Sequence, residues 1–271
     1  MRVFVLRVPL ADAELASDRL WLAGAAAIEE RDVAGGDIEL RTILADSDHT
    51  SLARVGPLPA GWNASFDMVD DRPAQTWRQF SEPIVVNDGL VIRPAWRPVE
   101  AAEGVLQIEI EPGGSFGLGD HPTTRLSADA TWRLAQRGDR VLDVGCGSGV
   151  LSIIAAHRGV AGVTAVDIAE AAREATVDNA QRNAVADRVQ ASTTPVGQID
   201  GPFDLVLANI LAPVLVSMAA DLKRLTGSQG RLVLSGVLAG RHDHVLEALS
   251  PMRAVSTTEL EGWAAVELEP G

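Results

Sequence analysis

The sequence predicts an α/β protein whose main domain holds a mostly parallel sheet, preceded by a smaller α+β domain. From about residue 113 onward, short apolar segments typical of buried strands alternate with amphipathic helical segments. Such alternation is typical of a parallel sheet covered by helices on both faces. Before it, the expected order is strand, helix, strand, strand, helix, strand, which is the order of a ferredoxin-like sandwich.

The smaller domain is expected within residues 1–70. Its second and third expected strands are separated by Ala34-Gly35-Gly36-Asp37, a sequence that favours a tight hairpin. Gly24 follows the first apolar helix and is expected to end it. The expected strands are residues 3–8, 25–31, 38–44 and 62–69, and the expected helices are residues 12–24 and 50–55.

Residues 71–112 are expected to connect the two domains, and residues 113–271 to form the main one. Residues 83–98 are rich in Pro, Val and Trp, which predicts extended strands leading into the main domain. Within the main domain, the expected strands are residues 140–144, 162–167, 203–208, 231–237 and 263–268, and the expected helices are residues 150–158, 169–183 and 213–225.

Composition excludes several kinds of protein. The formal net charge is −14, so we expect no direct nucleic-acid binding, which needs clustered Lys and Arg. This acidity either keeps the protein soluble or suits a basic protein partner. No apolar run is long enough to span a bilayer, and residues 1–10 lack a signal-peptide pattern. Because Cys146 is the one cysteine, no intrachain disulfide is possible, which fits a cytoplasmic protein. We further expect a monomer that does not associate with membranes.

The strongest local signal is a glycine-rich turn between a buried strand and a helix. Residues 141–149 read Val-Leu-Asp-Val-Gly-Cys-Gly-Ser-Gly. Glycine is needed where the backbone bends sharply or approaches a ligand without a β-carbon in the way. The helix that follows offers free N–H groups at its start. Such a turn also serves as a plain connection, so it does not by itself establish a ligand site.

Asp167 adds a second feature at the end of the next strand. A carboxylate there can accept hydrogen bonds from both hydroxyls of a ribose, or it can cap the helix that begins near Ala169. Together with the turn, it predicts a nucleoside site. The glycine spacing differs from the Gly-x-Gly-x-x-Gly of nicotinamide and flavin enzymes, and no P-loop lysine follows it. It resembles instead the first motif of class I S-adenosylmethionine-dependent methyltransferases.

Asn209-Ile210-Leu211 follows the next apolar strand, where the same class of enzymes carries its fourth motif. Methyl transfer is an in-line displacement, so a neutral nitrogen must be held about 3 Å from the methyl group with its lone pair along the C–S bond. The side-chain oxygen of Asn209 can accept amine hydrogens and set that direction. The alternative is that Asn209 caps the helix beginning near Pro213.

A loop and helix start precede the first strand of the main sheet. Two glycines lead into Pro122-Thr123-Thr124, whose hydroxyls either bind a carboxylate such as that of a methionine or only cap the helix. His121 stands alone. His242 and His244 have no cysteine or further histidine near them in the sequence, so we expect no metal site.

Taken together, these motifs resemble the bacterial methyltransferases of ribosomal protein L-eleven (L11). The resemblance covers nearly the whole chain and rests on residues 116–124, residues 141–149, Asp167 and residues 209–211. It implies a Rossmann-like domain with a seven-stranded, mostly parallel sheet that binds S-adenosylmethionine. The residues it implies at the cofactor are Thr124, Gly145, Gly147, Asp167 and Asn209, with Asn209 also catalytic. It further implies that the N-terminal domain binds L11 and that lysine ε-amino groups, and the N-terminal α-amino group as a further acceptor, are methylated.

Three departures from the family pattern leave other functions open, and one of them is an N-terminal domain that is trimmed around residues 46–59. Leu118 and Asp120 replace residues that are usually threonine, and Asp120 adds a negative charge near the cofactor carboxylate. Residues 191–195 lack the acidic residue that often meets adenine. The alternatives are a related protein-lysine or small-molecule methyltransferase with another substrate, and a catalytically silent binding module on the same fold. A nicotinamide oxidoreductase is a third alternative, which the glycine spacing disfavours.

Overall fold

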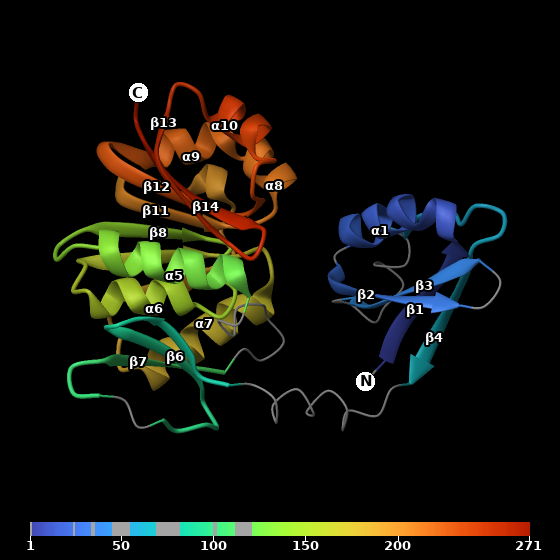
Figure 1. Ribbon diagram of the computed structural model, residues 1–271, viewed down its shortest axis with the longest axis horizontal. Helices are drawn as coiled ribbons and strands as arrows, with labels where there is room; N and C mark the ends of the chain where they lie inside the picture. The colour runs from blue at the N-terminus through green and yellow to red at the C-terminus, as the bar shows by residue number, and fades with distance from the viewer. Residues whose placement is uncertain are drawn as a thin grey trace. The chain divides into compact units, whose positions relative to one another are not determined.

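The computed structural model describes residues 2–23, 25–33, 36–44, 55–68, 82–99, 102–111 and 121–271. The chain divides into two compact units, residues 1–80 and residues 81–271 (Figure 1). The described strands between residues 84 and 110, expected from the sequence to lead into the main domain, fall in the second unit. None of the described helices is long and apolar enough to cross a membrane.

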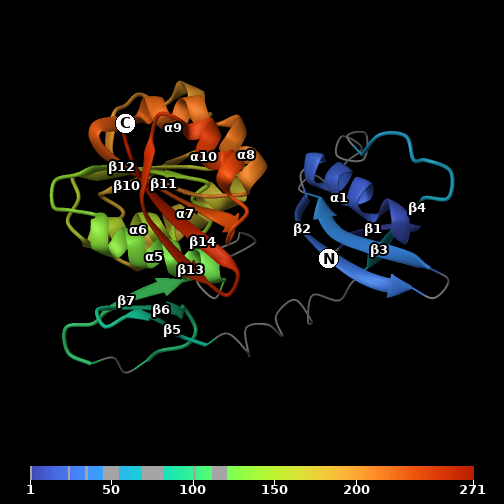
Figure 2. The ribbon, with the colours of Figure 1, turned by 45° about the horizontal axis from the view of Figure 1, so that its top comes forward.

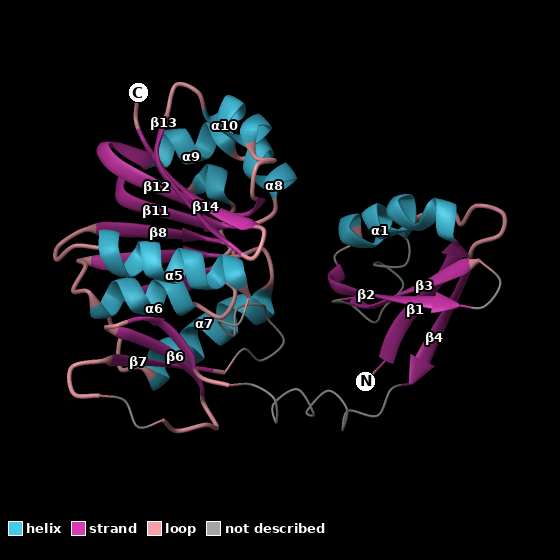
Figure 3. Cartoon of the chain, viewed as in Figure 1, coloured by secondary structure: helices cyan, strands magenta, loops and turns pink. Residues whose placement is uncertain are grey.

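The first unit is a four-stranded antiparallel sheet with a helix packed on it (Figure 3). Its strand order is β2-β3-β1-β4, which confirms the predicted ferredoxin-like arrangement. The second helix of that pattern, predicted at residues 50–55, lies mostly outside the described residues. The elements are β1 (Arg2–Pro9), a 3-10 turn at Leu10–Asp12, α1 (Ala13–Leu22), β2 (Ala25–Val33), β3 (Asp37–Leu44) and β4 (Asn63–Met68).

Alternating side chains build the core of this unit. Phe4, Leu6 and Val8 lie two residues apart along β1, so they project from the same face of the sheet, and all three are buried. Ala16 and Leu20 of α1, four residues apart on one face of the helix, pack into the same cluster. The hairpin predicted between the second and third strands is confirmed, because β2 pairs with β3 antiparallel.

The second unit is built on a seven-stranded sheet in the order β10-β9-β8-β11-β12-β14-β13. Its pairs from β10 to β12 are parallel, and β14 runs antiparallel to both of its neighbours, so the mostly parallel sheet is confirmed. The strands are β8 (Arg140–Val144), β9 (Gly162–Val166), β10 (Val189–Ser192), β11 (Phe203–Asn209), β12 (Thr226–Leu238), β13 (Arg253–Leu260) and β14 (Trp263–Glu269).

Helices cover both faces of this sheet (Figures 1 and 2). Val141 on one face belongs to the cluster that includes the first three helices, and its neighbour Leu142 belongs to the cluster of the last three, as the alternation along a strand requires. The first three helices are α5 (Pro122–Leu134), α6 (Val150–His157) and α7 (Glu170–Arg182), and the last three are α8 (Ala212–Ser217), α9 (Ala219–Leu225) and α10 (Asp243–Leu249).

A small three-stranded sheet packs against the helices of the first face (Figure 2). Its order is β5-β6-β7, with β6 and β7 parallel. Leu90, Ile92 and Ile108 are fully buried and join the core cluster of that face. The strands are β5 (Ile84–Asn87), β6 (Leu90–Pro94) and β7 (Leu106–Ile110).

The helix predicted at residues 213–225 is wrong as a single element. Two helices, α8 and α9, meet at Met218, whose φ of −95° and ψ of 1° leave the helical region. The hydroxyl of Ser217 donates to the carbonyl of Val214 at 2.7 Å, a local bond of the kind that competes with continued helix. The chain changes direction at this break, and α9 packs against β11 and β12.

Candidate active site

The glycine-rich turn joins β8 to α6 at the carboxyl edge of the main sheet. Gly145, Gly147 and Gly149 have φ values of +75°, +55° and +79°, a region that residues with a β-carbon rarely adopt. The N–H groups of Gly145 and Cys146 donate to the carbonyl of Val166, at 2.8 Å and 3.1 Å. The turn is therefore held against the end of the neighbouring strand β9.

Asp167 lies at that strand end, beside the turn. Its Oδ2 accepts from the N–H of Gly147 at 3.1 Å, and its Oδ1 accepts from the N–H of Ala169 at 3.0 Å. The structure thus brings together two of the predicted cofactor residues, Gly147 and Asp167. Each carboxylate oxygen has a second lone pair, so the contacts within the protein leave capacity for the hydroxyls of a ribose.

Asp143 is buried beneath the turn. Its Oδ2 accepts from the N–H of Ser152 at 3.1 Å and from the hydroxyl of Ser152 at 2.6 Å, which ties β8 to the first turns of α6. Burial raises the pKa of Asp143 to about 6. Burial, with Asp143 nearby, raises the pKa of Cys146 to about 12, so the thiol in the turn stays neutral at pH 7 and does not act as a thiolate nucleophile.

Asn209 ends β11 on the other side of β8, opposite Ser235 of β12. The helix that follows has Leu211 at its N-cap and no side-chain capping bond, so the alternative role of Asn209 as a helix cap is wrong. Next to it, Ile210 touches the glycine turn. A β-carbon built on Gly145 would lie 2.4 Å from Cγ2 of Ile210, so the Asn209 loop and the turn are in direct contact.

Thr124 lies in the first turn of α5. Its hydroxyl is buried, and Oγ1 has no hydrogen-bond partner in the described structure. His121 caps this helix: its Nδ1 lies 2.8 Å from Oγ1 of Thr123 and accepts from the N–H of Thr123 at 3.3 Å. The His121 ring packs edge-on against Trp263, with 5.0 Å between ring centroids.

The start of α5 therefore belongs to the same edge of the sheet as the turn. Trp263 opens β14 opposite Leu238, the last residue of β12, and parallel strands end together at one edge. Leu118 and Asp120, the two departures from the family loop, lie outside the described residues. Gly145, Gly147, Asp167, Asn209 and Thr124 all lie on elements that meet at the carboxyl edge.

Comparison with known proteins decides the family. A family model described as "Ribosomal protein L11 methyltransferase (PrmA)" matches residues 50–270. The chain belongs to this family. The ribosomal protein L11 methyltransferase of Symbiobacterium thermophilum is 35% identical over 262 residues, which cover 96% of this chain and 82% of the relative. That of Geobacter sulfurreducens is 38% identical over 238 residues, covering 87% of this chain and 77% of the relative.

A solved member of the PrmA family agrees with the fold. The crystal structure of ribosomal protein L11 methylase from Lactobacillus delbrueckii subsp. bulgaricus superposes with a TM-score of 0.65 at 28% identity, covering 69% of this chain and 98% of that one. The resemblance inferred from the motifs is therefore confirmed at the level of the family and of the class I methyltransferase fold.

Two residues that touch the glycine-rich turn were not predicted from the sequence. The hydroxyl of Thr176 donates to the carbonyl of Gly147 at 3.1 Å, and Nδ2 of Asn179 donates to the carbonyl of Ser148 at 2.9 Å. Both lie on α7 and both are fully buried. The available signal was a polar residue recurring at helical spacing, at positions 176, 179 and 183, which by pattern alone resembles a solvated helix face.

Two other kinds of site were considered in the described part of the chain, a metal site and a second cavity. Among the described residues, no group of three or more His, Cys, Asp or Glu is placed to hold a metal ion. A cavity of about 400 Å³ lies at the opposite, amino edge of the sheet, between Arg140, Gly162 and Phe203. It contains none of the predicted site residues.

Proposed function

We propose that this chain is an S-adenosylmethionine-dependent N-methyltransferase whose substrate is ribosomal protein L11. Its acceptors are lysine ε-amino groups, with the N-terminal α-amino group as a further one. Membership of the PrmA family supports the substrate. The meeting of the glycine turn, Asp167 and the Asn209 loop at one edge supports the chemistry.

The observation that carries the proposal is the unsatisfied hydroxyl of Thr124. A buried polar group without a partner costs free energy, so such a group in a folded site points to a ligand atom. Thr124 is 1% exposed, its Oγ1 has no hydrogen-bond partner among the described residues, and it lies at the start of a helix, where the helix dipole favours negative charge. The carboxylate of a methionine moiety has the acceptor atoms and charge that this position fits.

The remaining residues have separate roles in the proposed site. Asp167 would hold the ribose hydroxyls, and Gly145 and Gly147 would let the backbone approach the methionine end. The bound cofactor supplies an electrophilic methyl group. The side-chain oxygen of Asn209 would accept a hydrogen bond from the neutral acceptor amine and so direct the lone pair of the amine at that methyl group. The methylated amine would then lose its extra proton to solvent.

Substrate binding is proposed for the N-terminal domain, residues 1–70. Its ferredoxin-like sheet forms a unit with a core of its own, as expected of a module added to a catalytic domain. The net charge of −14 suits a basic partner such as a ribosomal protein. We further propose that the protein acts as a monomer in the cytoplasm.

Transfer of labelled methyl groups from S-adenosylmethionine to purified L11 tests this function. We expect label in L11, and in a lysate we expect L11 to be the main labelled protein. Label in another protein but not in L11 would show a methyltransferase with a different substrate. Calorimetry that finds no binding of S-adenosylmethionine would overturn the enzyme and favour a silent binding module.

A further inference from the structure

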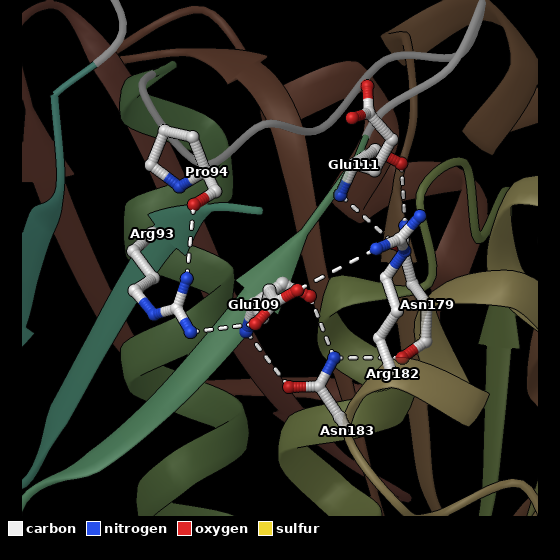
Figure 4. A network of polar contacts seen from close by, with 7 residues as sticks. All are labelled: Arg93, Pro94, Glu109, Glu111, Asn179, Arg182 and Asn183. Atoms are coloured by element: carbon white, nitrogen blue, oxygen red, sulfur yellow. Dashed lines mark hydrogen bonds and ion pairs between the residues drawn. The ribbon is translucent and has the colours of Figure 1, made fainter. Parts of the chain in front are cut away.

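Among the described strands, β7 has a neighbour on one side only, which is β6. The backbone N–H and C=O groups of its even-numbered residues point toward β6. For example, the carbonyl of Ile110 accepts from the N–H of Ala95, just after β6, at 2.9 Å. The N–H and C=O groups of Glu109 and Glu111 point to the other side. Buried backbone groups need partners, and here side chains of α7 supply them (Figure 4).

Asn179 of α7 and Asn183, the C-cap residue of this helix, bond to β7 where a further strand would. The side-chain amide of Asn183 accepts from the N–H of Glu109 at 2.9 Å and donates to its carbonyl at 2.7 Å. The amide of Asn179 does the same for Glu111, at 2.9 Å in both bonds. Because the two asparagines are four residues apart, they lie one above the other on the helix and match alternate residues of the strand.

Of the two asparagines, Asn179 is the one that bonds to the glycine-rich turn. The second hydrogen of its Nδ2 donates to the carbonyl of Ser148 at 2.9 Å. One turn earlier, Thr176 binds the carbonyl of Gly147. These bonds draw two consecutive carbonyls of the turn toward α7. The corresponding group of Asn183 donates instead to the carbonyl of Asn179, at 2.8 Å.

We propose that Asn179 is a positioning residue for the cofactor site, which rests on the function proposed above. One buried amide fixes both the end of β7 and the backbone of the glycine turn. In the chain, β7 is followed by α5, the helix that carries Thr124. Asn179 therefore connects the strand that precedes Thr124 to the glycine-rich turn. Loss of this amide would remove its bond to the Ser148 carbonyl, and we expect the turn to hold the cofactor less well as a result.

Asn183 provides the matched control. Its substitution removes the same kind of bonds to the same strand, one step further from the turn. β7 keeps another anchor, because the carboxylate of Glu109 contacts Arg93 at 2.7 Å and Arg182 at 3.7 Å (Figure 4). A purely structural role for the asparagines predicts that both substitutions act alike on cofactor binding.

The test measures the Kd of S-adenosylmethionine by calorimetry for the full-length wild-type, Asn179→Ala and Asn183→Ala proteins, with urea unfolding of each. We expect both variants to lose stability, Kd to rise about tenfold in Asn179→Ala, and Kd to stay within about twofold in Asn183→Ala. If Asn179→Ala does not fold, Asn179→Ser is measured against the same criterion, because its hydroxyl is too short to span Ser148 and Glu111.

Each outcome bears on one of the two proposals. Equal Kd values for wild-type protein and the Asn179 variant, or equal losses in the Asn179 and Asn183 variants, would overturn the positioning role. Absence of binding in the wild-type protein would instead overturn the proposed function. A rise in Kd confined to the Asn179 variant, with L11 KM unchanged, supports the positioning role.

Discussion

The side chain of Ile210 occupies the space that a β-carbon at Gly145 would need. Cγ2 of Ile210 would lie 2.4 Å from that atom. On its other side, the backbone of Ile210 closes on Gly236, whose β-carbon would lie 2.4 Å from the Ile210 carbonyl oxygen. The Asn209 loop is therefore clamped between two glycines, one of the glycine-rich turn and one of β12.

Substituting each glycine should distinguish the contact with the Ile210 side chain from the contact with the Ile210 backbone. Gly145→Ala should lower the free energy of unfolding by about 2–4 kcal/mol, from the clash and the positive φ together. Adding Ile210→Ala to Gly145→Ala should recover part of that loss, because the alanine at 145 clashes with the side chain of Ile210. Gly236→Ala should gain nothing from Ile210→Ala, because its clash is with backbone. Urea unfolding of the single and double variants measures these differences, and equal rescue at both glycines would refute the clamp.

Thr124→Val tests the unsatisfied hydroxyl. Valine has nearly the same shape, so the unbound protein should keep its stability or gain up to about 1 kcal/mol, while affinity for S-adenosylmethionine should fall about tenfold. The control is Thr123→Val, which removes a hydroxyl paired with His121 and should lower stability. Thermal unfolding and calorimetry give the two readouts. A Thr124→Val protein that binds the cofactor normally would remove Thr124 from the site.

Asp167→Ala should weaken cofactor binding by about 1–3 kcal/mol, the effect of leaving polar groups of the ligand without their partner. Asp204→Ala is the control, because Oδ2 of Asp204 also accepts a backbone N–H, that of Arg140 at 2.8 Å, but at the opposite edge of the sheet. Calorimetry should show a normal Kd for the Asp204 variant. Unchanged affinity after Asp167→Ala would contradict the ribose assignment.

The buried carboxyl of Asp143 predicts a pH dependence of stability. Its pKa is about 6 in the folded protein against a usual 3.8, so the folded state binds the proton more tightly than the unfolded state. The resulting stabilisation is complete below about pH 4 and is lost as pH rises through about 6, up to roughly 3 kcal/mol. Asp143→Asn should abolish this component. Urea unfolding between pH 4 and 7 measures it, and parallel curves for variant and wild type would show that Asp143 does not titrate there.

The fold was predictable where burial leaves a pattern. The strand at residues 140–144 agrees with β8 at both ends, because its apolar run is buried on both faces and ends at glycine. β13 was not predicted, because all its residues from Arg253 to Glu259 are exposed, so no apolar alternation marks them. β10 is four residues long with Val189 as its one buried residue, too short for a pattern.

Two residues of the proposed site could be predicted because they follow a strand. Asp167 and Asn209 stand at strand ends, and parallel strands deliver such residues to one edge. Asn179 could not be found in this way, because its burial depends on Glu111, which lies 68 residues earlier in the chain. In the sequence of α7 alone, a polar residue facing β7 cannot be told from one facing water.

The most direct measurement is the intact mass of purified L11 after incubation with S-adenosylmethionine and either the wild-type protein or Asn209→Ala. We predict that wild-type protein adds mass in steps of one methyl group replacing hydrogen. The Asn209 variant should do so far more slowly although it binds the cofactor nearly as tightly, because Asn209 directs the acceptor amine. Unmodified L11 with wild-type protein that binds the cofactor would contradict the proposed substrate, and equal rates for the two proteins would contradict the role of Asn209.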